Sequence, residues 1–294
     1  MGSFRKSLSQ LHLFVFLAGL TGPLGNLIQL NGLNLVMYRM GITSLVTILM
    51  YSFISNKISI SNKTKWHIIG VGILISMHWV LFYTSIKLSN VSIGLICLSS
   101  VALFTVLLDP LFTKKKIQWQ DLMIALISLL GILFIFQFDI QFRTGILVGL
   151  VSALFASIFT ILNKRLTNQY TTQSIQTFEM LGGLGFLTIV ILGMNQYQQV
   201  AFILPTQRDW FWLIILSLVC TVLANHLMLS ALKKISAFTL NVSLNLEPVY
   251  GIIIAIILFQ EHKQMGKGFY IGMSLIAISV MLQMLRVLRQ QKSK

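Results

Sequence analysis

Residues 90–116, NVSIGLICLSSVALFTVLLDPLFTKKK, form a long and almost uncharged run that ends in three lysines. A bilayer core requires about 20 mostly apolar residues for each helical span. The same arrangement, an apolar run between short charged gaps, recurs along the whole chain. It predicts an all-α polytopic membrane protein with ten transmembrane helices, at about 11–30, 33–55, 67–87, 90–112, 120–138, 145–163, 172–194, 210–232, 236–259 and 268–286.

The composition agrees with this class and excludes several others. Hydrophobic residues make up 56% of the 294 positions and charged residues 10%, which fits neither a soluble globule nor a disordered chain. The net charge of +15 comes from basic residues scattered at helix ends, so we expect no nucleic-acid partner. Cys97 and Cys220 lie in different spans without metal-ligand spacing, so we expect packing roles, no metal and no cofactor.

The basic residues also predict the orientation in the membrane. Sixteen of the 22 lysines and arginines lie at the termini or in the even-numbered gaps, and five lie in the odd-numbered gaps. Cytosolic loops of membrane proteins carry the excess of Lys and Arg. We therefore expect a multi-pass protein of the cytoplasmic membrane with both termini in the cytosol.

The chain resembles itself at an offset of about 140–146 residues. Trp66 and Trp212 open the third and eighth spans, and the ends of those two spans also fall into register. The offset predicts two repeats, 1–140 and 141–294, with five helices in each. An odd number of spans per repeat makes the second copy enter the membrane from the opposite side, which gives the inverted repeats of many secondary transporters.

Residues 236–282, SAFTLNVSLNLEPVYGIIIAIILFQEHKQMGKGFYIGMSLIAISVML, carry the most specific pattern in the chain. The Ser-Ala entry, Glu247-Pro248-Val249, Glu261 and Gly272 resemble the closing portion of an EamA-type repeat of the drug/metabolite transporter superfamily. Arg39 and Gly145 also lie where that family places such residues. The resemblance implies two five-helix repeats, with the third, fourth, eighth and ninth helices around a substrate cavity.

The first half departs from this pattern in two places. The repeat register puts Lys115 opposite Glu261, and Asp109-Pro110 lies about eight residues further along its helix than Glu247-Pro248. A role expected for the acidic residues of the second half is therefore not transferred to the first half.

Glu247 is the leading candidate for a functional charge in the membrane. An ionisable group inside a span is costly and usually faces protein or water, and Glu247 lies near the middle of the ninth span. Pro248 removes a backbone donor and loosens the turn before it. Glu247 is interpreted either as a site for a proton or a substrate amine, or as a structural carboxylate bonded to neighbouring helices.

The ninth span is polar on two sides. At 100° per residue, Thr239, Ser243 and Glu247 share one stripe, while Asn241 and Asn245 lie nearly opposite. A helix that is polar on both sides cannot face lipid. We expect one stripe to face a cavity and the other a helix interface, and either assignment is open.

Two histidines lie at similar positions of the two halves, His78 in the third span and His226 in the eighth. A histidine can relay protons at physiological pH, or it can be held by a neighbouring carbonyl as a structural residue. Asn225, Trp79 and Tyr83 are their neighbours in the sequence, and they complete the candidate set for substrate binding or proton coupling.

Arg39 and Glu179 are repeat partners in the second and seventh spans. Arg39 is expected near the outer end of its span and Glu179 near the inner end, so their backbones would differ by about 10 Å in depth. This argues for separate gating or packing roles rather than an ion pair. Pro23, with the glycines around it, predicts a weakened or hinged segment in the first span.

The leading functional hypothesis is a secondary transporter, either an exporter or an exchanger, of small metabolites such as amino acids, with protons as a candidate coupling ion. The sequence has no GxxxxGK[ST] loop for driving transport with ATP. The alternatives are a membrane-embedded helper or channel, and an intramembrane enzyme. The enzyme is disfavoured because the chain lacks HExxH and GxSxG motifs.

Overall fold

The computed structural model describes residues 2–53, 60–113, 117–138, 140–196 and 202–292, and every regular element among them is helical. The α-helices are α1 Gly2–Gly19, α2 Thr21–Leu27, α3 Gly32–Ser52, α4 Asn62–Leu88, α5 Val91–Leu98, α6 Val101–Thr113, α7 Trp119–Phe138, α8 Arg143–Leu166, α9 Thr172–Gln196, α10 Gln207–Ser217, α11 Ala224–Leu232, α12 Ala237–Ser243, α13 Glu247–Phe259 and α14 Lys267–Lys292. Three 3₁₀ turns, Ile140–Phe142, Leu244–Leu246 and Glu261–Gln264, and a π-helical segment, Leu218–Leu223, join some of them.

Seven helical stretches in the described chain are long and apolar enough to cross a membrane. They are Gly32–Ser52, Asn62–Leu88, Val91–Thr113, Trp119–Gln137, Ile140–Leu166, Thr172–Met194 and Gln207–Leu232. The runs predicted at 11–30, 236–259 and 268–286 are also helical, with Glu247–Phe259 and Lys267–Ser279 as shorter apolar stretches. The chain is therefore an all-helical, multi-pass membrane protein, and the count of ten spans stays a prediction.

Several predicted spans consist of two helices because local residues interrupt them. The first breaks between Gly19 and Thr21, beside the cluster with Pro23 that predicted a weak segment. The fourth breaks at Ser99 and Ser100. The hydroxyl of Ser100 donates to the carbonyl of Cys97 at 2.6 Å. Serine hydroxyls compete in this way with the backbone for hydrogen bonds.

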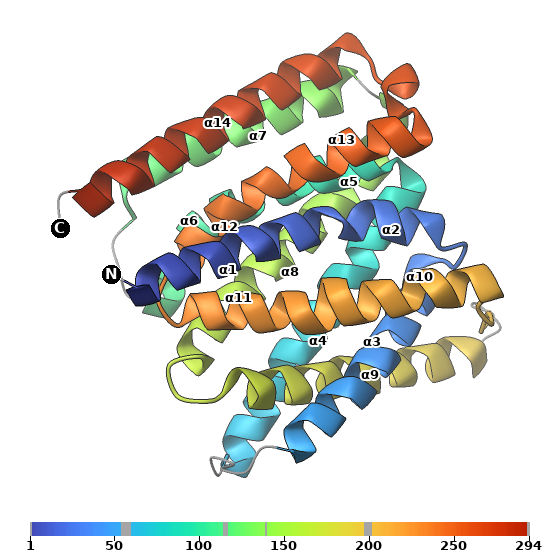
Figure 1. Cartoon of the computed structure of the whole chain (residues 1–294). Coiled ribbons are helices and arrows are strands. Elements are labelled where there is room, and N and C mark those ends of the chain that lie inside the picture. Colours follow the sequence, from blue (N-terminus) through green and yellow to red (C-terminus); the bar gives the residue numbers. More distant parts are fainter. Residues whose placement is uncertain (1, 54–59, 114–116, 139, 197–201, 293–294) are drawn as a thin grey trace.

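The helices form a bundle of roughly antiparallel elements (Figure 1). At one edge of it α7 and α14 lie side by side, and α3 and α9 pack together near the opposite edge. Between these edges α4 packs on both α8 and α9, and α1 packs on α11. The start of α1 and the end of α14 lie at the same end of the bundle (Figure 1).

Small residues allow the close contact between α7 and α14. A Cβ atom added to Gly272 would lie 2.3 Å from the carbonyl oxygen of Gly131, and one added to Gly131 would lie 2.6 Å from that of Gly272. Glycine at facing positions lets two membrane helices approach to backbone contact. Gly272 and Gly131 thus form the two sides of this contact.

Candidate functional site

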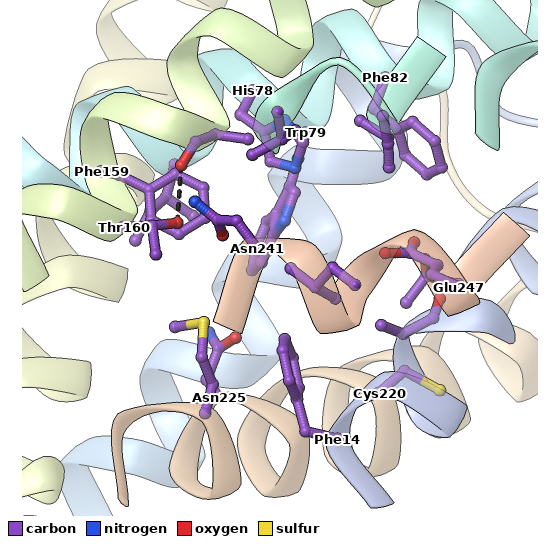
Figure 2. A pocket seen from close by; sticks show the side chains of 18 of the residues that line it. Phe14, His78, Trp79, Phe82, Phe159, Thr160, Cys220, Asn225, Asn241 and Glu247 are labelled. Atoms are coloured by element: carbon purple, nitrogen blue, oxygen red, sulfur yellow. Dashed lines mark hydrogen bonds between the residues drawn. The ribbon is translucent and has the colours of Figure 1, made fainter. Parts of the chain in front are cut away.

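A cavity of about 90 Å³ lies in the middle of the bundle, and helices from both halves of the chain line it. Its charged and amide-bearing side chains are Arg39, His78, Asn225, Asn241 and Glu247. Figure 2 shows His78 and Trp79 on one wall, with Phe14 and Asn225 across from them and Glu247 at one end. Aromatic rings therefore form much of the cavity wall, and the polar groups project between them.

Arg39 is fixed in place by contacts on all sides. Its side chain is 2% exposed, and its guanidinium stacks on the Trp79 ring with Cζ 3.9 Å from the ring centroid. Nε donates to Thr221 Oγ1 at 2.7 Å, Nη1 to Tyr83 Oη at 2.8 Å and Nη2 to the Cys220 carbonyl at 3.2 Å. A planar guanidinium supplies these divergent donors and the stacking face together, which an ammonium group cannot do.

The Cys220 carbonyl can accept from Arg39 because the backbone around Cys220 is not a regular α-helix. Residues 218–223 form a π-helical segment, in which the regular α-helical hydrogen bonds are shifted by one residue. Gln176 of α9 also donates to this segment, through Nε2 to the Val222 carbonyl at 3.0 Å. Single π-helical turns often mark functional sites, and this turn accepts hydrogen bonds from Arg39, which lines the cavity, and from Gln176.

Tyr83 lies behind the cavity wall and connects Arg39 to the break in the first span. Its hydroxyl accepts from Arg39 and donates to the Thr21 carbonyl at 3.3 Å. Thr21 itself lines the cavity at the start of α2, and Pro23 is buried two residues further on. The network joins α2, α3 and α4 to the π-helical segment.

Glu247 is the first residue of α13, where its carboxyl group lies on the cavity wall (Figure 2). It is 5% exposed, and no described basic group lies within 4.0 Å of it. Arg39, on the same cavity, interacts with it electrostatically at longer range. One cavity therefore holds a fixed cation and a carboxyl group that are not joined directly.

Pro248 lies at the start of α13, where the winding of the backbone changes. It follows the first residue of α13, where the missing N–H would have no partner in any case, and proline is well suited to that position. The preceding residues, Leu244–Leu246, form a 3₁₀ turn. Pro248 thus lies where a 3₁₀ turn changes to the regular helix α13, and its loosening of the preceding turn stays a prediction.

The 3₁₀ turn also changes which polar residues share a face. Asn241 and Glu247 were expected on opposite stripes of one regular helix, but both line the cavity. A 3₁₀ turn has 3.0 residues per turn, so the residues after it are rotated relative to a continuous α-helix. Ser243 donates to the Thr239 carbonyl at 2.9 Å instead of reaching the cavity, and the side chain of Asn245 is outside the described part of the chain.

In the side-chain amide of Asn241, the nitrogen is hydrogen-bonded and the oxygen is not. Its Nδ2 donates to Thr105 Oγ1 at 2.8 Å, and Thr105 is in turn 2.9 Å from Ser157 Oγ. Its Oδ1 is buried and has no hydrogen-bond partner among the described residues. This oxygen is an acceptor available to a bound molecule.

The two histidines have different surroundings. Nδ1 of His78 lies 2.8 Å from Ser152 Oγ and 3.0 Å from the Ser152 carbonyl, and the ring stacks on Phe82 with centroids 6.2 Å apart. His78 is thus oriented by α8 and lies on the cavity wall. His226 lies 3.3 Å from Thr172 Oγ1, away from the cavity residues, whereas its neighbour Asn225 lines the cavity.

Arg39 and Glu179 are not paired in the structure, and separate gating or packing roles for them stay a prediction. No ion pair within 4.0 Å joins them among the described residues, and Glu179 lies outside the set that lines the cavity. Thr221, Phe14 and Thr160 could not be singled out from the sequence, because an uncharged side chain in a span carries no energetic cost that marks it as functional.

The described residues contain no group of three or more His, Cys, Asp or Glu side chains placed to hold a metal ion. What the cavity does offer is a fixed guanidinium, a separate carboxyl group, free amide groups and aromatic faces. These groups together can bind a small molecule that carries both charges and an apolar part.

Known proteins match this chain over most of its length. It is 21% identical over 249 residues to the uncharacterized transporter sll1164 of Synechocystis sp. (strain ATCC 27184 / PCC 6803 / Kazusa), a match that covers 79% of this chain and 69% of that protein. It is 23% identical over 155 residues to the uncharacterized transporter YetK of Bacillus subtilis (strain 168), covering 50% and 46%. A protein of known crystal structure has the same fold, with a TM-score of 0.65, 16% identity and coverage of 97% and 98%.

The family comparison covers nearly all of the chain and matches it twice. The EamA-like transporter family matches residues 6–137 and again residues 143–285. These ranges contain the cavity residues from Phe14 to Glu247 and the apolar helices that can cross a membrane. The chain therefore belongs to the EamA-like transporter family and is a multi-pass membrane transporter.

Proposed function

We propose that the protein is a secondary transporter of small zwitterionic metabolites such as amino acids, working as an exporter or exchanger in the cytoplasmic membrane. The single observation that carries this substrate class is that Arg39 and Glu247 line one cavity without forming an ion pair with each other. A zwitterion can place its carboxylate toward the guanidinium and its ammonium group toward Glu247. Each partner then replaces part of the hydration that the substrate loses on entering the site.

The walls of the cavity support the same class of substrate. Phe14, Phe82 and Phe159 offer apolar surface to a side chain, while Asn225 and Asn241 offer hydrogen bonds. Ligand sites are usually apolar pockets with a few well-placed polar groups. With a cavity volume of about 90 Å³, amino acids with small apolar side chains fit the proposed site best.

The packing of the helices supports two inverted repeats and alternating access. Contacts between equivalent spans join α3 to α9, α5 to α13 and α7 to α14. The contact of α4 with α8 has its counterpart in the contact of α1 with α11, as an exchange of the two halves requires. We infer ten spans, repeats at 1–140 and 141–294, and a substrate site between them that opens alternately to the two sides.

Counterflow in proteoliposomes tests the proposed function. Vesicles that contain the purified protein are loaded with one unlabelled amino acid at a time, and the uptake of the same radiolabelled amino acid is followed. We expect transient accumulation for at least one amino acid, faster when a pH gradient is imposed. Equilibration without accumulation would indicate a channel, and no uptake of any amino acid would reject this substrate class.

The same protein in detergent provides an independent measure of binding. An amino acid that shows counterflow should raise the melting temperature of the wild-type protein, because a ligand that binds only the native state stabilises it. A melting temperature that no amino acid changes would argue against a zwitterion site in the cavity.

A further inference from the structure

Glu179 lies away from the substrate cavity, on α9 where this helix packs against α4. Its side chain is 0% exposed. Both of its carboxyl oxygens are buried and have no hydrogen-bond partner among the described residues, and the same is true of both amide atoms of Asn163 on α8. Among the described residues, Asn163 is the polar side chain that acts on the Glu179 carboxyl group, although no hydrogen bond joins the two in this conformation.

The backbone of α9 at Glu179 is in close contact with α4. A Cβ atom added to Gly72 of α4 would lie 1.9 Å from the carbonyl oxygen of Glu179 and 2.8 Å from its Cα. One turn further along, a Cβ atom on Gly182 would lie 2.5 Å from the carbonyl oxygen of Ile69. The two helices, one from each half of the chain, are therefore in backbone contact where Glu179 is buried.

Four basic side chains on the elements around Glu179 are directed to other groups. Lys65 of α4 lies over the Phe178 ring at 6.0 Å, and Lys164 of α8 donates to the Leu232 carbonyl. Arg39 of α3 is held in the cavity network, and His226 of α11 lies beside Thr172. No charged side chain is among the described groups that act on the Glu179 carboxyl.

An ionised carboxylate in such a place would lose its hydration without gaining a donor or a cation, which costs several kcal/mol. A neutral carboxylic acid needs one acceptor for its O–H and can accept one N–H through its carbonyl oxygen. The Asn163 amide has both groups to offer. The carboxylic acid and the carboxamide are thus complementary, whereas the carboxylate is not matched by its surroundings.

We propose that Glu179 and Asn163 form a proton-binding site at the contact between α4 and α9, separate from the substrate cavity. With the proton bound, acid and amide pair through two hydrogen bonds and the two helices stay closed. Release of the proton requires water at the site, so α4 and α9 must separate. The site therefore links proton binding to the relative position of the two halves.

Infrared spectroscopy of the full-length protein in lipid vesicles tests this proposal directly. A protonated carboxyl group has its own C=O stretching band, and the chain has only seven Asp and Glu residues to assign. We expect a band at neutral pH that is absent in Glu179→Gln and shifted in Asn163→Leu, and that fades reversibly when the pH is raised. Glu261→Gln is the matched control and should leave the band unchanged, because Glu261 lies elsewhere and accepts from two backbone N–H groups and one hydroxyl.

The melting temperature gives a second readout on the same vesicles. It should fall in the pH range where the band fades, because the ionised form is destabilised in the closed contact, and Glu179→Gln should remove this pH dependence. A band that Glu179→Gln leaves unchanged would overturn the proposal, and so would a Glu179 band that persists up to the pH at which the protein unfolds. If Glu179→Gln does not fold, the shift in Asn163→Leu decides instead.

Neither measurement requires a transported molecule. The proposal of a proton site can thus be rejected while counterflow supports the proposed transport function. The infrared band can equally support the proton site when counterflow finds no transported amino acid.

Discussion

At the scale of single residues, the site depends on Arg39, which contacts residues from several helical elements. Arg39 reaches Tyr83, Thr221 and the Cys220 carbonyl, while Trp79 covers its face. A buried charge with this many partners is held in one geometry. Glu247, in contrast, has no basic partner among the described residues, which leaves its carboxyl group free for a ligand or a proton.

Glu247→Gln is expected to abolish the pH dependence of transport without preventing folding. The amide keeps the shape of the side chain, but it cannot pair with an ammonium group as a charge or exchange a proton. The measurement is counterflow of the amino acid that the wild-type protein accumulates best, at several pH values. Normal transport with unchanged pH dependence would show that Glu247 is structural.

Arg39→Lys is expected to lower the affinity for a zwitterion and to destabilise the protein by about 2 kcal/mol. The ammonium group keeps the charge but cannot meet three acceptors and stack on Trp79 at once. Melting temperature and counterflow KM measure the two effects. Arg208→Lys, at an exposed position, is the matched control and should change neither.

At the scale of elements, the helix breaks and helix ends determine where the polar groups lie. The π-helical segment 218–223 presents the Cys220 carbonyl, and the 3₁₀ turn before α13 brings Asn241 and Glu247 onto one cavity. At the far end of α13, Glu261 accepts from the backbone N–H groups of Val91 and Ser92. This carboxylate caps the start of α5, so it joins the two halves of the chain.

Glu261→Gln is expected to destabilise the protein by about 2 kcal/mol, because an amide is a weaker acceptor than a carboxylate for two N–H groups and the Ser92 hydroxyl. The pH dependence of transport should persist, in contrast to Glu247→Gln. Thermal unfolding and counterflow at several pH values test the pair. An unchanged melting temperature would contradict the capping role.

Gly272→Ala is expected to destabilise the contact of α7 with α14 by about 1–3 kcal/mol, since the new Cβ would meet the Gly131 carbonyl. Gly193→Ala is the matched control. Nothing lies within 4 Å of a Cβ atom at that position of α9, so the change should be neutral or slightly stabilising. Equal melting temperatures for the two variants would show that α7 and α14 do not need this close approach.

At the scale of the whole molecule, the charge distribution and the bundle support one orientation. The sixteen-to-five division of basic residues predicts cytosolic termini, and the two ends of the described chain lie at the same end of the bundle (Figure 1). An even number of membrane crossings places the two ends of a chain on the same side of the membrane.

Cysteine labelling with a membrane-impermeant reagent on intact cells tests this orientation. In a variant without Cys97 and Cys220, a cysteine at position 208 should react from outside and one at position 63 only after the cells are opened. Both positions are exposed in the structure, so a lack of reaction reports their side of the membrane. Labelling of position 63 on intact cells would contradict the ten-span arrangement with cytosolic termini.

Much of this molecule could be predicted from its sequence. The apolar runs predicted an all-helical membrane protein, because each span must satisfy its own backbone hydrogen bonds and remove its charges from the lipid. The pattern around Glu247-Pro248 led to the EamA family, which the comparison confirms. Single charges within spans drew attention to Arg39 and Glu247, which share the cavity, since charge is the costliest feature a span can carry.

Only the tertiary structure decided which of these polar residues meet. Whether His78 or His226 reached the cavity, and whether Asn241 shared a face with Glu247, depended on helix breaks whose rotation a regular 3.6-residue pattern does not contain. The pairing of Arg39 with the Cys220 carbonyl depended on a π-helical turn in another helix. The sequence shows that burying the charge of Arg39 in a span costs free energy. The partners that offset this cost, Thr221 and the Cys220 carbonyl, lie about 180 positions away along the chain, so they meet Arg39 only when the helices pack.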